Sequence, residues 1–262
     1  MFLQYRTDNR SIAVIAHRGG AGLRPENTLS ALQHANSLGV HFSEIDLHMS
    51  RDGVLVVIHD STVDRTTNGT GLVQDLTLTQ LKQLDAGYTW SNDQGKTFPF
   101  RGQGITIPTL TEVFNAFPQQ PLQLEIKQKQ PAILAELRTL ICRYNRTHQT
   151  LISGFDHKTI KTFRRLFPDV NTTASLRELH YFSYFHRILP IAYPRLSPIL
   201  SAPMYMLTQS FVKKAHQKNK HVYVWTVNER EDMQRMIELG VNAILTDFPD
   251  RLLQLLLEAP VI

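Results

Sequence analysis

The sequence has a single cysteine and no long apolar run. Among its 262 residues, Cys142 stands alone, which excludes a disulfide-rich scaffold and leaves no cysteine spacing typical of a zinc finger. The first apolar run, 12–16, is too short for a signal peptide or a membrane-spanning helix. We therefore expect a protein of a reducing compartment, located in the cytoplasm.

The excess of one charge sign over the other is also small, because the sequence has 28 lysines and arginines and 23 aspartates and glutamates, a formal net charge of +5. The basic residues are scattered, which argues against nucleic-acid binding, although a mild positive excess is compatible with phosphate-bearing ligands. Internal repeats, low-complexity tracts and linkers are absent. With 42% hydrophobic residues the chain can bury one sizeable core, so we expect a single domain over residues 1–262.

Short apolar runs of strand length alternate with helical patterns along the chain. The predicted strands are 12–16, 42–47, 54–58, 122–126, 150–153, 170–174, 222–227 and 243–246. The predicted helices are 29–38, 131–144, 157–167, 210–218 and 230–239, with Asn27 capping the first, which ends at Gly39, and Gly240 ending the last. This alternation indicates an α/β protein with a parallel sheet, and eight such units match one closed (β/α)8 TIM barrel.

Two segments interrupt the alternation. Residues 60–121, after the third predicted strand, are too long for one crossover and rich in turn residues, which predicts a small insertion beside the barrel mouth. Residues 181–205 are rich in aromatics, leucine and proline, which predicts an irregular or short-helical segment in place of the sixth crossover. This second segment is either an apolar cover packed on the barrel or a rim that receives an acyl chain or touches a membrane.

Carboxylates interrupt two of the predicted strands. Glu44 and Asp46 are two residues apart, so both side chains project to the same face, which is unfavourable unless a cation neutralises them. Glu125 and Lys127 repeat this spacing on another strand. Either pair taken alone is most often a solvated face or a salt bridge. Together the three carboxylates offer oxygen ligands, which suit Mg²⁺ or Ca²⁺ better than zinc.

Histidines stand at the ends of two predicted strands. His17, with Arg18 beside it, follows the first strand, and His59 follows the third. Gly19 and Gly20 come next and are expected to let a ligand approach the backbone. A lone histidine is more often a packing residue. The C-terminal strand ends, however, form the catalytic face of a parallel barrel, and there these groups converge with the carboxylates.

Other residues at strand ends carry weaker signals. Trp225 either fills the top of the barrel or contacts a ligand, and Asp247 is equally suited to cap the last helix. Ser153 lacks the Gly-x-Ser-x-Gly surroundings of a nucleophile elbow. The phosphate-binding loops of nucleotide-binding proteins are absent as well.

Taken in order along the chain, these motifs resemble those of the glycerophosphodiester phosphodiesterases. The matching stretches are His17-Arg18-Gly19, Pro25-Glu26-Asn27-Thr28, Glu44-x-Asp46, His59-Asp60, Asp64-Arg65-Thr66, Glu125-Ile126-Lys127, Trp225-Thr226-Val227-Asn228 and Thr246-Asp247. They run nearly end to end and are jointly specific, and the (β/α)8 barrel of that family agrees with the predicted fold. One departure is Gly154, which follows Ser153 where a second serine is common in the family.

The resemblance implies one divalent cation, Mg²⁺ or Ca²⁺, and an acid–base pair of histidines. The expected roles are metal ligand for Glu44, Asp46 and Glu125, phosphate contact for Arg18 and Lys127, further substrate contact for Trp225, base for His17 and acid for His59. A hard cation polarises the diester while one histidine accepts a proton and the other donates one. The nucleophile is either water or the neighbouring hydroxyl of the glycerol, which would give a cyclic phosphate first.

The activity implied is that of a hydrolase of glycerol and lipid metabolism, which cleaves glycerophosphodiesters to sn-glycerol 3-phosphate and an alcohol. One alternative is a lysophospholipase D that acts on lysophospholipids at a membrane surface, with contact through 181–205. An alternative of another class is a non-catalytic barrel that binds phosphodiesters or a protein partner. Such a barrel would be expected to lose acid–base or metal residues, and all of these are present here. The oligomeric state stays open.

Overall fold

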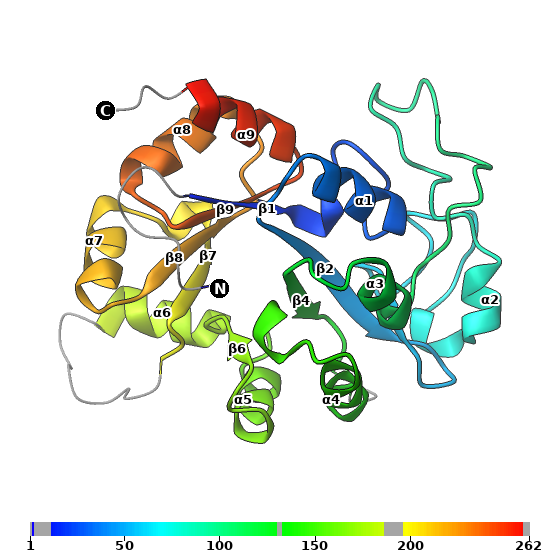
Figure 1. The fold of residues 1–262 in the computed structure, drawn as a ribbon, viewed down its shortest axis with the longest axis horizontal. Coiled ribbons are helices and arrows are strands. Elements are labelled where there is room, and N and C mark those ends of the chain that lie inside the picture. Colours follow the sequence, from blue (N-terminus) through cyan, green and yellow to red (C-terminus); the bar gives the residue numbers. More distant parts are fainter. Residues whose placement is uncertain (1, 3–11, 130–132, 186–195, 259–262) are drawn as a thin grey trace.

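The structure is a computed structural model that describes residues 2, 12–129, 133–185 and 196–258 (Figure 1). At its centre, eight parallel strands form a nearly closed ring with helices around the outside. The barrel strands are β1 (Ala13–Ala16), β2 (Phe42–Met49), β4 (Leu122–Ile126), β5 (Thr150–Ser153), β6 (Asn171–Thr172), β7 (Ile199–Pro203), β8 (His221–Trp225) and β9 (Ala243–Thr246). Their order is β6, β5, β4, β2, β1, β9, β8, β7, and a parallel bridge between Thr173 and Ile199 joins the ends. The predicted TIM barrel is confirmed.

The barrel strands differ from the predicted set at two places. The run 54–58 forms β3 (Leu55–Val57), which pairs antiparallel with β2 and lies outside the ring. The tight turn at Gly53, with a φ of 82°, reverses the chain between these two strands. Conversely, β7 lies within 181–205, where the surrounding prolines and aromatics gave no strand pattern. The predicted number of strands is right, but one member was wrong and one was missed.

Helices follow the barrel strands and cover the outer face, except the short helix 78–82, which lies away from the ring in the segment between β3 and β4 (Figure 1). Their bounds are α1 (Leu29–Ser37), α2 (Leu78–Lys82), α3 (Leu110–Ala116), α4 (Leu134–Arg143), α5 (His157–Leu166), α6 (Leu176–Phe185), α7 (Gln209–Gln217), α8 (Arg230–Leu239) and α9 (Pro249–Glu258), with 3-10 turns η1 (His17–Gly19), η2 (Val73–Asp75), η3 (Thr147–Gln149) and η4 (Met204–Met206). Gly240 ends α8 as predicted, whereas the side chain that caps α1 is that of Thr28 and not that of Asn27. Within the described ranges, no helix is both long enough and apolar enough to cross a membrane.

The segment 181–205 is more regular than predicted, since it contains the end of α6, all of β7 and the start of η4. Residues 186–195 within it lie outside the described part of the chain. Phe182 is 2% exposed and packs edge-on against Phe211 of α7, with 5.1 Å between ring centroids. Tyr184 and Tyr205 are exposed. The described residues of this segment therefore include both an apolar cover and outward-facing aromatics.

Alternate residues of each barrel strand point inward, and they build the platform on which the mouth stands. An apolar cluster inside the barrel includes Ile15, Tyr223 and Leu245. Two larger clusters lie between the strands and the outer helices. On β2, Glu44 and Asp46 follow Phe42 on the same inward face, so the strand carries its charges above an apolar layer. The core thus fixes the height at which these carboxylates stand.

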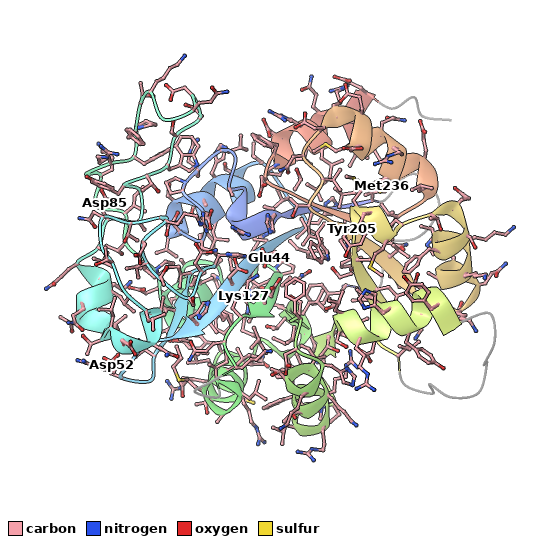
Figure 2. The ribbon with its side chains drawn as sticks, turned by 180° about the vertical axis from the view of Figure 1, so that it is seen from behind. Glu44, Asp52, Asp85, Lys127, Tyr205 and Met236 are labelled. Carbon is pink, nitrogen blue, oxygen red and sulfur yellow. The ribbon has the colours of Figure 1, made fainter. Side chains whose placement is uncertain are left out.

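Between β3 and β4 the chain leaves the barrel and forms the insertion predicted at 60–121, whose Asp85 lies at the edge of the molecule in Figure 2. Apolar residues of the insertion pack in one cluster with Val56 of β3 and Ile58. Two contacts tie it to the loop after β1: Trp90 Nε1 donates to the Ala21 carbonyl at 2.9 Å, and Arg65 Nη2 lies 2.7 Å from Glu26 Oε1. Because of these ties we propose that the barrel and the insertion form one domain.

Arg146 holds a loop of the barrel together from inside. It is 1% exposed, and its guanidinium donates to the carbonyls of Phe117, Pro118 and Gln120 while lying over the ring of Phe114. Arg146→Met leaves these carbonyls without their donors, and each lost partner of a buried polar group costs on the order of 1–3 kcal/mol. We expect the free energy of unfolding to fall by about 3 kcal/mol, measured by urea denaturation.

The control for this prediction is Arg143→Ala, which removes an exposed arginine near the end of α4 and should change stability by less than about 0.5 kcal/mol. An Arg146→Met protein with the urea midpoint of the parent would refute the structural role of the guanidinium.

Candidate active site

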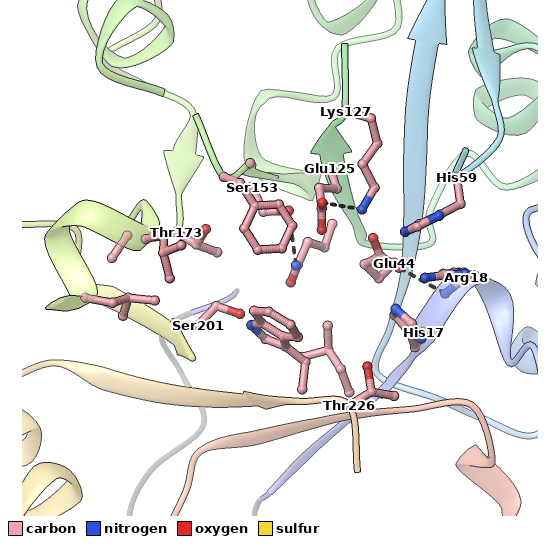
Figure 3. A pocket seen from close by; sticks show the side chains of 18 residues that line it. His17, Arg18, Glu44, His59, Glu125, Lys127, Ser153, Thr173, Ser201 and Thr226 are labelled. Atoms are coloured by element: carbon pink, nitrogen blue, oxygen red, sulfur yellow. Dashed lines mark hydrogen bonds and ion pairs between the residues drawn. The ribbon is translucent and has the colours of Figure 1, made fainter. Parts of the chain in front are cut away.

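The eight residues that the sequence singles out come together at the mouth of the barrel. Seven of them line one pocket (Figure 3): His17, Arg18, Glu44, His59, Glu125, Lys127 and Trp225. The eighth, Asp46, lies beside the pocket and is 1% exposed. The C-terminal ends of parallel strands are the site-forming end of such barrels, and the pocket lies there.

Three carboxylates form the centre of the site. Asp46 on β2 and Glu125 on β4 are paired in register, and Glu44 precedes Asp46 by one pleat. One oxygen from each of the three residues lies within 4.8 Å of the other two, close enough to share one ion. The backbone N–H of Arg18, a residue with a φ of 51°, donates to Glu44 Oε2 at 2.9 Å. Glu44 Oε1 is buried and has no hydrogen-bond partner among the described residues.

The charges of this cluster are only partly balanced by the protein. Lys127 Nζ lies 3.2 Å from Asp46 Oδ1 and 2.5 Å from Glu125 Oε1. Burial raises the pKa of Asp46, but Lys127 and His59 outweigh it and hold that pKa below its ordinary value. Burial and the neighbouring Asp46 raise the pKa of Glu44 to about 8, and burial also raises that of Glu125 despite Lys127. An unpartnered oxygen and uncompensated negative charge are what a divalent cation would satisfy, so the residues fit one.

Asn27 belongs to this cluster and not to the helix cap that the sequence predicted. Its side-chain Nδ2 donates to Asp46 Oδ2 at 2.8 Å, and its Oδ1 accepts from the backbone N–H of Asp46 at 3.1 Å. The residue has a φ of 59°, a left-handed conformation that asparagine tolerates better than most side chains. Asn27 therefore fixes the orientation of Asp46, and its neighbour Thr28 takes over the cap.

His17 is oriented by a carboxylate that comes from the far end of the chain. Its Nδ1 lies 2.7 Å from Asp247 Oδ1, and Asp247 Oδ2 accepts from Asn228 Nδ2 at 2.7 Å. Burial lowers the pKa of His17, but the bond to Asp247 and the charge of Glu44 outweigh it, so the net pKa is raised. The sequence showed Asp247 at a strand end, equally suited to cap the last helix, and did not connect it with His17.

His59 is oriented in the same way by the next residue. Its Nδ1 lies 2.6 Å from Asp60 Oδ1, and Asp60 Oδ2 accepts from Arg65 Nε at 2.6 Å. Arg65 reaches onward with both terminal nitrogens to Glu26, at 2.8 and 2.7 Å, and Glu26 accepts from Arg18 Nη1 at 3.1 Å. Burial opposes ionisation of Asp60, but its bonds to Arg65 and His59 lower its pKa to about 2. One chain of contacts therefore links the second histidine to the arginine of the mouth.

His59 reaches the site by a route that the sequence did not predict. It follows the antiparallel strand β3 and not a parallel barrel strand. The backbone N–H of Ile58 donates to the Asp46 carbonyl at 3.1 Å, and His48 Nε2 lies 3.2 Å from the His59 carbonyl. The hairpin thus returns along β2 and delivers the histidine beside the carboxylates.

The glycines after His17 serve packing and not ligand approach, which corrects the expectation from sequence. Neither residue lines the pocket. A Cβ on Gly19, whose φ is 79°, would lie 2.9 Å from the Cβ of Ala31 on α1. Gly20 faces Pro249 at the start of α9. The two glycines let η1 sit tightly between these helices.

The opposite side of the pocket is apolar. Phe155, which is 48% exposed, meets Trp225 edge-on at 5.6 Å between ring centroids, and Leu176 lines the pocket with them. Lys127 Nζ lies 5.5 Å from the centre of the Phe155 ring, where the two halves of the pocket meet. Trp225 therefore contributes to the pocket wall. The arrangement suits a ligand with an anionic centre and a carbon-rich arm.

Comparisons with known proteins agree over nearly the whole chain. A sequence model of the glycerophosphoryl diester phosphodiesterase family matches residues 17–251. A glycerophosphodiester phosphodiesterase of Caldanaerobacter subterraneus subsp. tengcongensis is 36% identical over 247 residues, which cover 92% of this chain and 96% of the relative. A lysophospholipase D of Homo sapiens is 27% identical over 269 residues, 91% of this chain and 84% of the relative. The structure of an Oleispira antarctica phosphodiesterase in complex with the product sn-glycerol-3-phosphate has a TM-score of 0.76 at 26% identity, covering 95% of this chain and 98% of that one.

Proposed function

Because the chain belongs to the glycerophosphoryl diester phosphodiesterase family, we propose that it hydrolyses glycerophosphodiesters to sn-glycerol 3-phosphate and an alcohol. The observation that carries this proposal is the buried group Glu44, Asp46 and Glu125, flanked by two histidines that each rest on a carboxylate. The relative solved with sn-glycerol-3-phosphate supports the identity of the product.

Glu44, Asp46 and Glu125 would hold one divalent cation, Mg²⁺ or Ca²⁺, because all three offer hard oxygen ligands. When bound, the ion polarises a phosphoryl oxygen and offsets the negative charge that builds up at phosphorus. Arg18 and Lys127 line the same pocket and bind the remaining phosphate oxygens. The site is therefore acidic at its centre and basic at its rim, which suits a phosphodiester.

His17 acts as the base and His59 as the acid. Each uses Nδ1 to contact a carboxylate, which leaves Nε2 for proton exchange with the substrate. Besides His17, the Asp247 carboxylate accepts a hydrogen bond from the neutral amide of Asn228, so its charge stabilises the imidazolium that forms when His17 accepts a proton. The Asp60 carboxylate contacts both His59 and the cation Arg65, and Arg65 offsets part of the charge that acts on His59. His17 deprotonates either water or the neighbouring glycerol hydroxyl, and His59 protonates the departing alkoxide.

The test of the proposed function is choline release from glycerophosphocholine. With saturating Mg²⁺ or Ca²⁺ we expect turnover that a chelator abolishes and that the added ion restores, because the carboxylate group needs its cation. If neither ion gives chelator-sensitive turnover on any glycerophosphodiester, the protein is a non-catalytic barrel that binds phosphodiesters or a protein partner.

A second candidate function, that of a lysophospholipase D, is favoured by the apolar side of the pocket. Phe155 and Tyr205 are exposed near the mouth, and the human relative carries that name. An acyl chain could lie along this side, with peripheral contact to a membrane through the described part of 181–205. Choline release from glycerophosphocholine and from lysophosphatidylcholine, measured side by side, separates the two. We expect a higher kcat/KM for the water-soluble substrate, and the reverse ranking would establish the lipid enzyme.

A further inference from the structure

The floor of the pocket carries a polar group that the chemistry above leaves unused. Gln123 lies on β4 two residues before Glu125, so it shares the inward face and stands about 7 Å deeper in the barrel. The side chain is 2% exposed and lines the pocket. Its Nε2 donates to Ser153 Oγ at 3.2 Å, while its Oε1 is buried and has no hydrogen-bond partner among the described residues.

Besides Ser153, two more small hydroxyl side chains line this pocket. Thr173 and Ser201 line the same pocket, and both are almost fully buried (Figure 3). Burying an unpartnered amide oxygen inside a barrel is unfavourable, because the oxygen loses its hydrogen bonds to water. A ligand that brings a hydroxyl to Gln123 Oε1 removes that cost. The floor is therefore built for a donor, whereas the carboxylate group above it is built for a cation.

The walls above the floor are apolar. Leu245, Trp225 and Phe155 all line the pocket, and the rings of Phe155 and Trp225 meet edge-on with 5.6 Å between their centroids. A ligand that fits this space has a short hydrocarbon chain with hydroxyl groups at its inner end and a phosphate at the level of Glu125. That description matches a glycerol esterified to phosphate, with its hydroxyls directed down into the barrel.

We propose that Gln123, with Ser201, forms a subsite for the hydroxyl groups of the glycerol and thereby selects deacylated glycerophosphodiesters. The inference rests on the proposed function and adds the orientation of the substrate. The glycerol occupies the enclosed end of the pocket, and the alcohol that leaves points toward the open mouth. An acyl group on the glycerol would replace the hydroxyl that Gln123 receives, so the same residue disfavours lysophospholipids.

The test is Gln123→Leu, which keeps the approximate size of the side chain and removes its acceptor. In the metal-loaded protein we expect kcat/KM for glycerophosphocholine to fall about 10- to 100-fold. Hydrolysis of bis(p-nitrophenyl) phosphate, which has no glycerol, should change less than about twofold. Inhibition by sn-glycerol 3-phosphate should weaken by the same factor as kcat/KM for glycerophosphocholine falls. Inhibition by inorganic phosphate should not change.

Thr150→Val provides the matched control, because Thr150 is a buried hydroxyl residue on the adjacent strand β5 that does not line the pocket. This substitution should change the hydrolysis of neither glycerophosphocholine nor bis(p-nitrophenyl) phosphate. Equal losses of Gln123→Leu on both substrates, or no loss on either, would overturn the subsite. If the unaltered protein hydrolyses no phosphodiester, the proposed function fails separately. Calorimetric binding of sn-glycerol 3-phosphate to the two variants then still decides the role of Gln123.

Discussion

Replacing Glu44 with glutamine is expected to lower kcat/KM for glycerophosphocholine by roughly 10³-fold. Glu44 Oε1 is buried and has no hydrogen-bond partner among the described residues, so Glu44 is the proposed ligand whose loss the protein has least means to replace. A divalent cation at this site would supply several kcal/mol of transition-state stabilisation, and each 1.36 kcal/mol corresponds to a factor of ten in rate. The measurement is choline release at saturating Mg²⁺ or Ca²⁺, together with the shift of the melting temperature on adding the ion.

In the metal-free protein the same substitution should be stabilising at high pH. Burial and the charge of Asp46 raise the pKa of Glu44 from 4.5 to about 8, so the folded state favours the protonated form. Stability contributed in this way is complete below pH 4.5 and is lost as the pH rises toward 8. With chelator present, the parent should therefore melt at a lower temperature at pH 8 than at pH 5, and Glu44→Gln should lack this part of the decrease.

Glu231→Gln is the control, since Glu231 is exposed in the first turn of α8. It should change neither activity nor the pH dependence of melting. An active Glu44→Gln protein that still gains stability from the cation would remove Glu44 from the metal site.

The short apolar runs predicted the fold well, because the strands of a closed barrel are buried and therefore apolar. Strands β1, β2, β4, β5, β6, β8 and β9 coincide with predicted runs. The two errors in the predicted strands are β3 and β7. The run at β3 is fully buried, yet it pairs antiparallel after the turn at Gly53. Strand β7 contains a proline and follows an aromatic-rich stretch, so its five buried residues did not stand out from the surrounding sequence.

The candidate site was predictable to the extent that each group stands at a strand end. Such positions share one rim whatever the loops do, which is why Glu44, Glu125 and His17 could be placed together without a structure. The partners of the histidines were not predictable in this way. Asp247 is separated from His17 by 230 residues, and no spacing rule connects them. Asn27 carries a signal typical of a helix cap, and only the structure separates that role from its bond to Asp46.

The second large effect is expected for His59→Ala and depends on the leaving group. An alkoxide such as that of choline needs a proton as the P–O bond breaks, so loss of the acid should cost about 10²- to 10⁴-fold in kcat. The p-nitrophenyl ester of glycerol 3-phosphate releases a stabilised phenolate that needs no acid, and its hydrolysis should fall less than about tenfold. Both substrates carry the same glycerol, so a difference between them reports on the departing group.

His17→Ala distinguishes the two roles, because loss of the base should slow both substrates to a similar degree. His148→Ala, at an exposed histidine of η3, should slow neither. A His59→Ala protein that loses equal activity on both substrates would sink the assignment of His59 as the acid. If His17→Ala showed the dependence on the leaving group and His59→Ala did not, His17 would be the acid and His59 the base. The contact of Arg65 with Asp60 would then not determine which histidine releases a proton. The contacts of the two carboxylates, Asp247 with an amide and Asp60 with a guanidinium, are the physical reason to expect the first outcome.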